Sequence, residues 1–173
     1  MKTKSRDHLA FLMILPEKPT VTRFLAQLST TMSKTNTSIA YHLALPVKDL
    51  GATMRFYQDV LGCTIGRTSY RWVDVNFFGH QITFHEDPAR VRPGDGQFNA
   101  SSFPVFHFGA ILSEPIWNKL FQKLKNMDLA FEVEPKTVFP GETGEQKTYF
   151  ITDPSGYYLE FKTFSSREMI FKT

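Results

Sequence analysis

Apolar and polar positions follow the same order twice along the chain, and each time the order predicts a βαβββ module. In the first half, the apolar run over residues 39–47 predicts a strand. Apolar residues then recur at spacings of four, three and four from Leu50 to Leu61, which predicts an amphipathic helix that Gly62 ends. Three short strands are expected after this helix, over residues 63–67, 71–77 and 80–85.

The order restarts in the second half. We expect a strand over residues 105–112 and then a helix that Ser113 caps, with an apolar stripe that continues to Met127. Residues 136–145, rich in Gly, Pro and Glu, are predicted to form an added loop. The chain is therefore interpreted as an internal duplication with an α+β fold. The three further strands are expected over residues 131–134, 146–152 and 157–162.

The duplication sets the predicted domain organisation. Between the two halves lies a polar segment with three prolines at its edges and Gly94-Asp95-Gly96 inside it, which is the composition of a linker. The predicted segments are an N-terminal extension (1–38), module one (39–86), the linker (87–104), module two (105–164) and a C-terminal tail (165–173), with 39–164 forming a single domain.

Composition and charge narrow the function classes. The chain has 173 residues, 42% of them apolar, which suits one globular domain. Residues 1–31 hold five Lys or Arg against two acidic residues, so they account for the net charge of +3, and the remaining 15 basic and 15 acidic residues balance. We therefore expect no nucleic-acid partner, and no apolar run reaches the length of a membrane span. The single cysteine, Cys63, excludes an intramolecular disulfide and is typical of a reducing, cytoplasmic setting.

The stretch from Asp153 to Phe161 combines a tight turn with a short strand that carries a carboxylate. Pro154 and Gly156 suit a β-turn, because proline fixes φ and glycine tolerates a positive φ. An ionised Glu160 facing a cavity would have to be paired, hydrogen-bonded or bound to a metal. Alternation along the strand places three polar side chains on one face, namely Tyr158, Glu160 and Lys162.

Two histidines occupy corresponding positions in the duplication. His42 and His107 each lie in the first predicted strand of a module. When the two final strands are aligned through their turn glycines, Thr83 matches Glu160, and alternation places His85 on the same face as Thr83. Any one of these histidines alone would more often be a packed polar residue. Together with a carboxylate at a matching position, the pair favours a metal site.

The modules resemble the vicinal oxygen chelate superfamily, which includes glyoxalase I, extradiol dioxygenases, fosfomycin-resistance enzymes and bleomycin-resistance proteins. The residues that carry the resemblance are the first strands YHLALPV and FHFG and the ending DPSGYYLEF, within residues 39–164. The resemblance implies that curved mixed sheets of two tandem βαβββ modules enclose a metal-binding cleft. It also implies three metal ligands on the first and last strands: His42, His107 and Glu160.

Two imidazoles and one carboxylate would form a facial triad and leave open positions for a substrate that chelates through adjacent oxygens. Fe(II) is the favoured metal, and Mn, Zn or Ni would accept the same ligands. His85 is a candidate base beside the substrate, with a place at the rim beside Glu86 as the alternative. Tyr158, ahead of Tyr149, is the candidate phenol donor.

The first functional hypothesis is a divalent-metal-dependent oxidoreductase of the extradiol dioxygenase type, acting on a small aromatic or diol. A glyoxalase-like isomerase or lyase, or a thiol transferase, is the closest alternative. The third is a non-catalytic ligand-binding protein of the bleomycin-resistance type, which typically lacks the metal ligands. Thr83 stands where glyoxalase I would carry a further carboxylate ligand, which disfavours a glutathione-dependent isomerase. The expected partner is a small anionic or oxygen-chelating molecule, and the resemblance is compatible with a homodimer.

Overall fold

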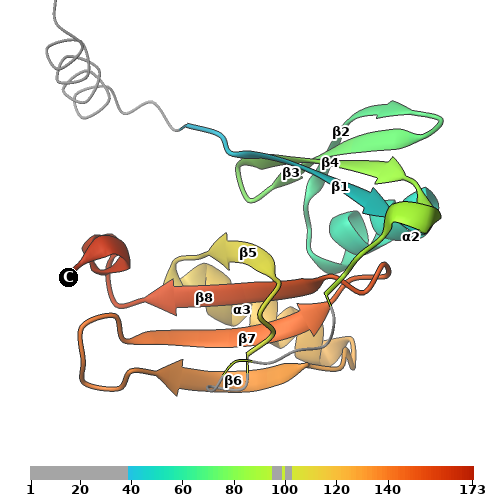
Figure 1. Ribbon diagram of the computed structural model, residues 1–173. Helices are drawn as coiled ribbons and strands as arrows, with labels where there is room; N and C mark the ends of the chain where they lie inside the picture. Colours follow the sequence, from blue (N-terminus) through green and yellow to red (C-terminus); the bar gives the residue numbers. More distant parts are fainter. Residues whose placement is uncertain (1–38, 95–98, 100–102) are drawn as a thin grey trace, which may run out of the picture. The chain divides into compact units, whose positions relative to one another are not determined.

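The computed structural model describes residues 39–94, 99 and 103–173 and confirms the two βαβββ modules (Figure 1). The predicted extension over residues 1–38 and part of the predicted linker lie outside the described residues. Residues 40–173 form one compact unit.

Module one contains β1 (His42–Val47), α2 (Leu50–Arg55), η1 (Phe56–Val60), β2 (Thr64–Ser69), β3 (Trp72–Phe77) and β4 (His80–Glu86). Module two contains β5 (Phe108–Ile111), α3 (Glu114–Asn126), β6 (Val133–Val138), β7 (Gln146–Thr152) and β8 (Tyr158–Phe164). Two short helical turns flank module two, η2 (Pro88–Arg90) and η3 (Arg167–Phe171).

Two predicted boundaries are wrong. The strand expected over residues 105–112 is shortened to β5, because the backbone bends at residues 105–106 and the Pro104 carbonyl accepts from the ring of His107. His107 therefore precedes β5. The strand expected over residues 131–134 is displaced to β6, which pairs with β7 as far as Val138 and includes a register shift beside Pro135. Proline is tolerated there because β6 is an edge strand, and the predicted added loop shrinks accordingly.

The sheet register confirms the duplication. The first sheet has the order β1-β4-β3-β2 and the second sheet has the order β5-β8-β7-β6 (Figure 1). Ala44 of β1 pairs with Thr83 of β4, and Gly109 of β5 pairs with Glu160 of β8. His42 and His107 each lie two residues before the paired residue, so Thr83 and Glu160 are structural equivalents, as the sequence alignment predicted.

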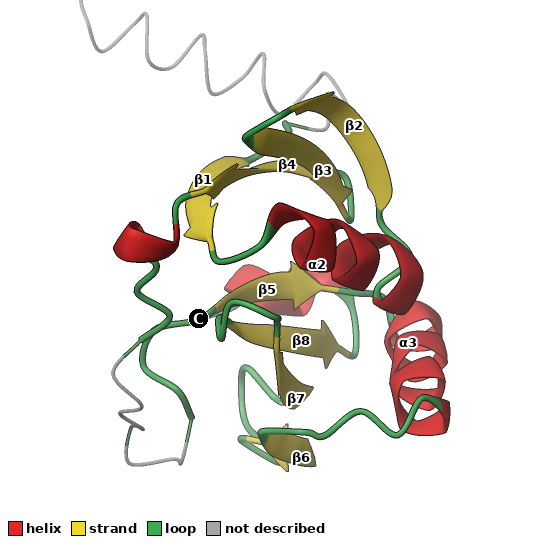
Figure 2. Cartoon of the chain, turned by 90° about the vertical axis from the view of Figure 1, so that its right-hand side faces the viewer, coloured by secondary structure: helices red, strands yellow, loops and turns green. Residues whose placement is uncertain are grey.

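The helices cover one face of each sheet (Figure 2). The Asp49 Oδ1 accepts from the Ala52 amide at 2.6 Å, which confirms the predicted cap of α2. Ser113 lies at the predicted cap position of α3 but makes no side-chain capping bond. The Trp117 indole of α3 donates to the Phe161 carbonyl of β8 at 2.9 Å, which fixes this helix to the second sheet. None of the helices in the described ranges is long and apolar enough to cross a membrane.

The two sheets share one aromatic core through their helix-covered faces. Phe77 of β3 places its ring 6.0 Å from the ring of Phe108 and 6.3 Å from that of Phe161. Tyr57 packs at 4.6 Å against Phe84 of β4. Because side chains alternate across a strand, the opposite face of each sheet points away from this core. We call these opposite faces the polar faces; the first carries Asp74 and Thr83, and the second carries Thr148 and Glu160.

The turn before β8 ties module two to module one. Asp153 is buried, and its Oδ1 accepts from the amides of Ser155 and Tyr157 at 2.9 Å each. Its Oδ2 accepts from the Tyr57 hydroxyl of module one at 3.2 Å. The Tyr157 hydroxyl donates to the carbonyl of Pro46 at 2.8 Å. One carboxylate therefore both shapes the turn that aims β8 and joins it to the first module.

Asp153→Ala is expected to destabilise the protein by about 2–4 kcal/mol, because two buried amides and a buried hydroxyl lose their acceptor together. Tyr57→Phe removes only the hydroxyl donor and is expected to cost about 1 kcal/mol. Urea unfolding followed by circular dichroism measures both free energies. Equal losses in the two variants would show that Asp153 does not organise the turn.

Candidate functional site

The polar face of the second sheet presents a buried carboxylate with three partners. Glu160 of β8 is 6% exposed. Its Oε1 accepts from the Thr148 hydroxyl at 2.8 Å, and its Oε2 lies 2.9 Å from the Lys162 Nζ. The same Oε2 lies 3.4 Å from the Nε2 of His107. Glu160 thus joins side chains from β7, β8 and the segment before β5.

These partners set the charges of the cluster. Burial alone would raise the pKa of Glu160, but the hydrogen bonds from His107, Lys162 and Thr148 outweigh it and lower the pKa to about 2. The hydrogen bond to Glu160 raises the pKa of His107, against the opposing effect of burial. Without a metal, the cluster is therefore an anionic carboxylate that accepts from Thr148 and lies between Lys162 and His107.

Metal-free protein is expected to lose stability in acid through Glu160. Its folded pKa of about 2 lies below the usual value of about 4.5 for an unfolded chain, so its stabilising contribution is present above about pH 4.5 and disappears as the pH falls toward 2. The contribution amounts to about 3 kcal/mol at neutral pH. Unfolding free energies of wild type and Glu160→Gln between pH 7 and pH 2.5 measure it. The variant should show the flatter profile, and parallel profiles would exclude the assignment.

The ring of His107 is oriented as a metal ligand would be. Its Nδ1 lies 2.7 Å from the Pro104 carbonyl oxygen, which can only accept, so Nδ1 carries a proton. Nε2 is then the nitrogen that faces Glu160. Metal-bound histidines commonly donate their other ring nitrogen to a backbone carbonyl in this way. An imidazole nitrogen and a carboxylate oxygen at one point suit Fe(II), Mn²⁺ or Zn²⁺, so the residues fit a divalent metal.

The other predicted residues are placed as follows. His42 is exposed at the start of β1, beside Gln81 of β4, and so shares the polar face of the first sheet with Thr83. His85 is exposed on that same face, two residues after Thr83. The Thr83 hydroxyl donates to Asp74 Oδ1 at 2.6 Å. Tyr158 begins β8 on the face of Glu160, whereas Tyr149 is buried on the helix-covered face.

The structure brings His107 and Glu160 together and leaves His42 apart from them. Within the part of the chain that the structure describes, no group of three or more His, Cys, Asp or Glu is placed to hold a metal ion. The expectation that the three ligands converge within one chain is therefore wrong. The reason is the packing of the modules: the helix-covered faces meet in the aromatic core, so the two polar faces point away from each other.

Asp74 is a site residue that sequence reasoning missed. It is buried on β3, where it accepts from Thr83 and pairs with Arg67 at 2.9 Å. Burial raises its pKa, but the hydrogen bonds from Thr83 and Arg67 outweigh this effect, and the pKa lies below the usual range. The signal was a carboxylate between apolar residues in the strand WVDVNF, the same pattern that identified Glu160.

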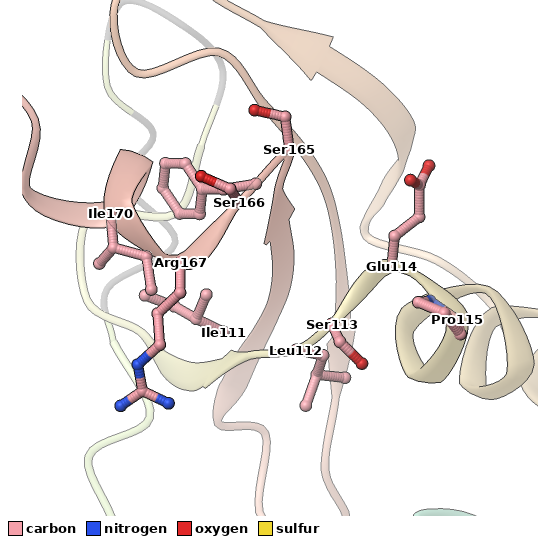
Figure 3. A pocket seen from close by; sticks show the side chains of 10 residues that line it. Ile111, Leu112, Ser113, Glu114, Pro115, Ser165, Ser166, Arg167 and Ile170 are labelled. Carbon is pink, nitrogen blue, oxygen red and sulfur yellow. The ribbon is translucent and has the colours of Figure 1, made fainter.

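Another hollow lies away from these residues, at the ends of β5 and β8. It has a volume of about 420 Å³ and is bordered by the start of α3 and by η3 (Figure 3). Its charged residues are Glu114, which pairs with Lys147 at 2.6 Å, and Arg167. No predicted site residue lines it.

Comparisons with known proteins agree on one family. Residues 40–161 match the family model described as the Glyoxalase/Bleomycin resistance protein/Dioxygenase superfamily. A virulence protein of Salmonella typhimurium is 27% identical over 123 residues, which cover 71% of this chain and 82% of that protein. A FosB metallothiol transferase of Lysinibacillus sphaericus is 24% identical over 127 residues, covering 70% of this chain and 79% of that protein.

The same likeness holds in three dimensions. The crystal structure of a glyoxalase/bleomycin resistance protein/dioxygenase from Alicyclobacillus acidocaldarius superposes with a TM-score of 0.66 and is 28% identical in sequence. The superposition covers 79% of this chain and 98% of that one.

Proposed function

Because the chain belongs to the glyoxalase/bleomycin resistance protein/dioxygenase superfamily, we propose that it is a divalent-metal-dependent enzyme whose small substrate binds through adjacent oxygens. The observation that carries the proposal is the pairing of His107 with Glu160. A buried carboxylate faces an imidazole nitrogen whose ring is held by the Pro104 carbonyl, and a lysine lies beside them. The Pro104 carbonyl fixes the ring so that Nε2 faces Glu160, and metal-bound histidines are commonly oriented by a backbone carbonyl in this way.

We assign the metal to His107 and Glu160 of one copy and to His42 of the partner subunit. Within one chain the polar faces point apart, yet a two-fold dimer can bring the first polar face of each copy against the second polar face of the other. His42 supports this assignment because it is exposed on the first polar face, at the position equivalent to His107 in the duplication. The arrangement would complete two identical sites per dimer.

A bound divalent cation would polarise the substrate's oxygens and, as Fe(II), would allow chemistry with molecular oxygen. Lys162 now neutralises Glu160, and once a cation does so it can bind an anionic substrate oxygen instead. Tyr158, on the face of Glu160, is the proposed phenol donor, and His85 of the partner subunit is the proposed base. These roles divide binding, protonation and proton removal among different side chains.

An aromatic wall favours a dioxygenase among the reactions of the family. Phe150 of β7 packs its ring 5.2 Å from that of His107. Phe103 stacks on Phe150 at 5.3 Å, and the Nζ of Lys136 lies 4.2 Å from the ring of Phe103. Phe150 is itself buried, so the half-buried ring of Phe103 is the apolar surface near His107 that suits a planar substrate such as a catechol. We therefore place an extradiol-type dioxygenase first.

A thiol transferase is the second candidate. Lys162 beside Glu160 could hold a strongly anionic substrate, and the Lysinibacillus relative is named a metallothiol transferase. Elemental analysis of protein purified without added metal, followed by parallel assays of oxygen consumption with catechols and of thiol consumption, separates the two reactions. Oxygen uptake that requires Fe(II) and is lost in Glu160→Gln is expected. If the metal-loaded protein consumes neither oxygen nor thiol, both candidates are contradicted.

Mixing two inactive variants tests whether the site is shared between copies. His42→Ala and His107→Ala homodimers should each lack activity, but a mixed dimer keeps one site with every ligand. Refolding the two together should therefore recover about a quarter of the wild-type activity, since about half of the dimers are mixed and each has one intact site.

The matched control mixes His107→Ala with Glu160→Gln. These two residues belong to the same module, so each site of the mixed dimer still lacks one ligand and no activity should return. Recovery in this control, or failure in the first mixture despite dimers confirmed by light scattering, would refute the shared site.

A further inference from the structure

The polar face of the first sheet contains a hollow that the proposed metal chemistry does not use. It has a volume of about 330 Å³ and lies over β2, β3 and β4. Neither His107 nor Glu160 lines it. The side chains that matter to its chemistry are those of Arg67, Asp74, Asn76, His80 and Gln81.

Arg67 is held in one orientation although it is largely exposed. Its Nε and Nη2 both lie 2.9 Å from Oδ2 of Asp74, so one edge of the guanidinium is occupied. Its Cζ lies 5.6 Å from the ring of Trp72. The other edge, formed by Nη1 and the second hydrogen of Nη2, has no hydrogen-bond partner among residues 39–94, 99 and 103–173. Arg67 lines the hollow, and this edge leaves a pair of coplanar N–H groups for an acceptor.

The carboxylate of the hollow is already satisfied. Asp74 is 5% exposed, and its carboxylate accepts from Thr83 and Arg67 and also interacts with Gln81. The register shift in β2 between Ile65 and Thr68 lies opposite Asp74 and positions Arg67 for this contact. A cation entering the hollow would find its one carboxylate taken, so a metal does not suit this place.

The groups left over are donors. His80 accepts from the Tyr41 amide through Nδ1 at 3.0 Å, so the proton of its neutral ring lies on Nε2. Asn76 accepts from the Gly79 amide through Oδ1 at 2.8 Å, which leaves its NH₂ group to donate. Together with Arg67, these residues give the hollow an excess of donors over acceptors.

We propose that this hollow binds the carboxylate group of a small organic acid, with both oxygens on the unoccupied edge of Arg67. The two coplanar N–H groups match the two oxygens of a carboxylate. The charges of Arg67 and Asp74 cancel. A bound carboxylate would therefore give the hollow a net charge of about −1, which is less unfavourable than the charge of about −2 that a phosphate would bring. The site lies on the first polar face, beside Gln81, and uses none of the side chains proposed as metal ligands.

The test is an amide-resolved NMR titration of ¹⁵N-labelled full-length protein in EDTA. Sodium acetate is added at constant ionic strength, with sodium chloride as the reference. Saturable shifts are expected at Gly66, Asn76, Gly79 and Gln81. Arg67→Gln should weaken binding at least about tenfold, and Arg67→Lys should lose most of it as well because the amine lacks the planar edge.

Arg90→Gln is the matched control, because Arg90 also pairs with an aspartate at 3.0 Å but does not line the hollow. It should bind acetate like wild type. Non-saturating shifts spread over surface lysines, or unchanged affinity in Arg67→Gln, would overturn the proposal. Tighter binding of phosphate than of acetate would overturn the choice of carboxylate. Glu160→Gln should bind acetate normally, and loss of binding there would place the anion at the metal site instead.

Discussion

Gly109→Ala is expected to destabilise the protein by more than about 3 kcal/mol and to lower its unfolding midpoint by about 10 °C or more. Gly109 pairs with Glu160 across the parallel strands β5 and β8. A Cβ atom at this position would overlap the carbonyl oxygen, the carbonyl carbon and the amide nitrogen of Glu160. These are backbone atoms of a central strand, so they cannot swing aside as a flexible side chain would. Relief requires β5 to separate from β8.

Gly51→Ala is the matched control for this result. A Cβ atom at Gly51 would approach only the side-chain ends of Asp49 and Arg55, at 3.3 and 3.4 Å. Alanine also favours the helix by up to about 1 kcal/mol, so this variant should be as stable as wild type or slightly more stable. Thermal unfolding and urea titration measure both variants. A Gly109→Ala protein that unfolds like Gly51→Ala would show that β5 and β8 tolerate separation.

The parts of the site that one strand determines could be predicted from the sequence. Alternation after the Asp-Pro-Ser-Gly turn places Glu160 and Lys162 on one face, and the structure pairs them at 2.9 Å. The match between Thr83 and Glu160 could also be predicted, because each final strand follows a turn that contains a glycine with a positive φ, Gly79 or Gly156. In both cases the turn sets the position at which the strand starts, and the alternation of side chains along the strand then determines the face on which each residue lies.

Features that depend on the packing of one module against the other could not be predicted. Whether the polar faces of one chain meet is decided by contacts such as Phe77 with Phe108 and Phe161. The apolar periodicity of the strands predicts that these phenylalanines are buried, but it does not predict which sheet they pack against. The ion pair of Arg67 with Asp74 depends on a register shift in β2, which the pattern of that strand does not reveal.

Glu160→Gln is expected to abolish metal binding while leaving a folded protein. Glutamine keeps the size of the side chain and can still accept from the Thr148 hydroxyl, but it lacks the charge that a divalent cation requires. At neutral pH the metal-free variant should lose about 3 kcal/mol of stability, because Lys162 and His107 lose their anionic partner. Glu134→Gln, an exposed substitution on β6, should change neither property.

Thermal unfolding of all three proteins, with EDTA and with Fe(II) or Mn²⁺ under anaerobic conditions, separates metal binding from structure. A metal that binds the folded state stabilises it by RT ln(1 + [L]/Kd), or about 2.7 kcal/mol at a hundredfold excess over Kd. Wild type and Glu134→Gln should both gain this stability, and Glu160→Gln should gain almost none. Equal gains in all three proteins would exclude Glu160 as a ligand. A loss of stability in Glu160→Gln with no metal response in wild type would instead identify the cluster as an ion pair that serves the fold.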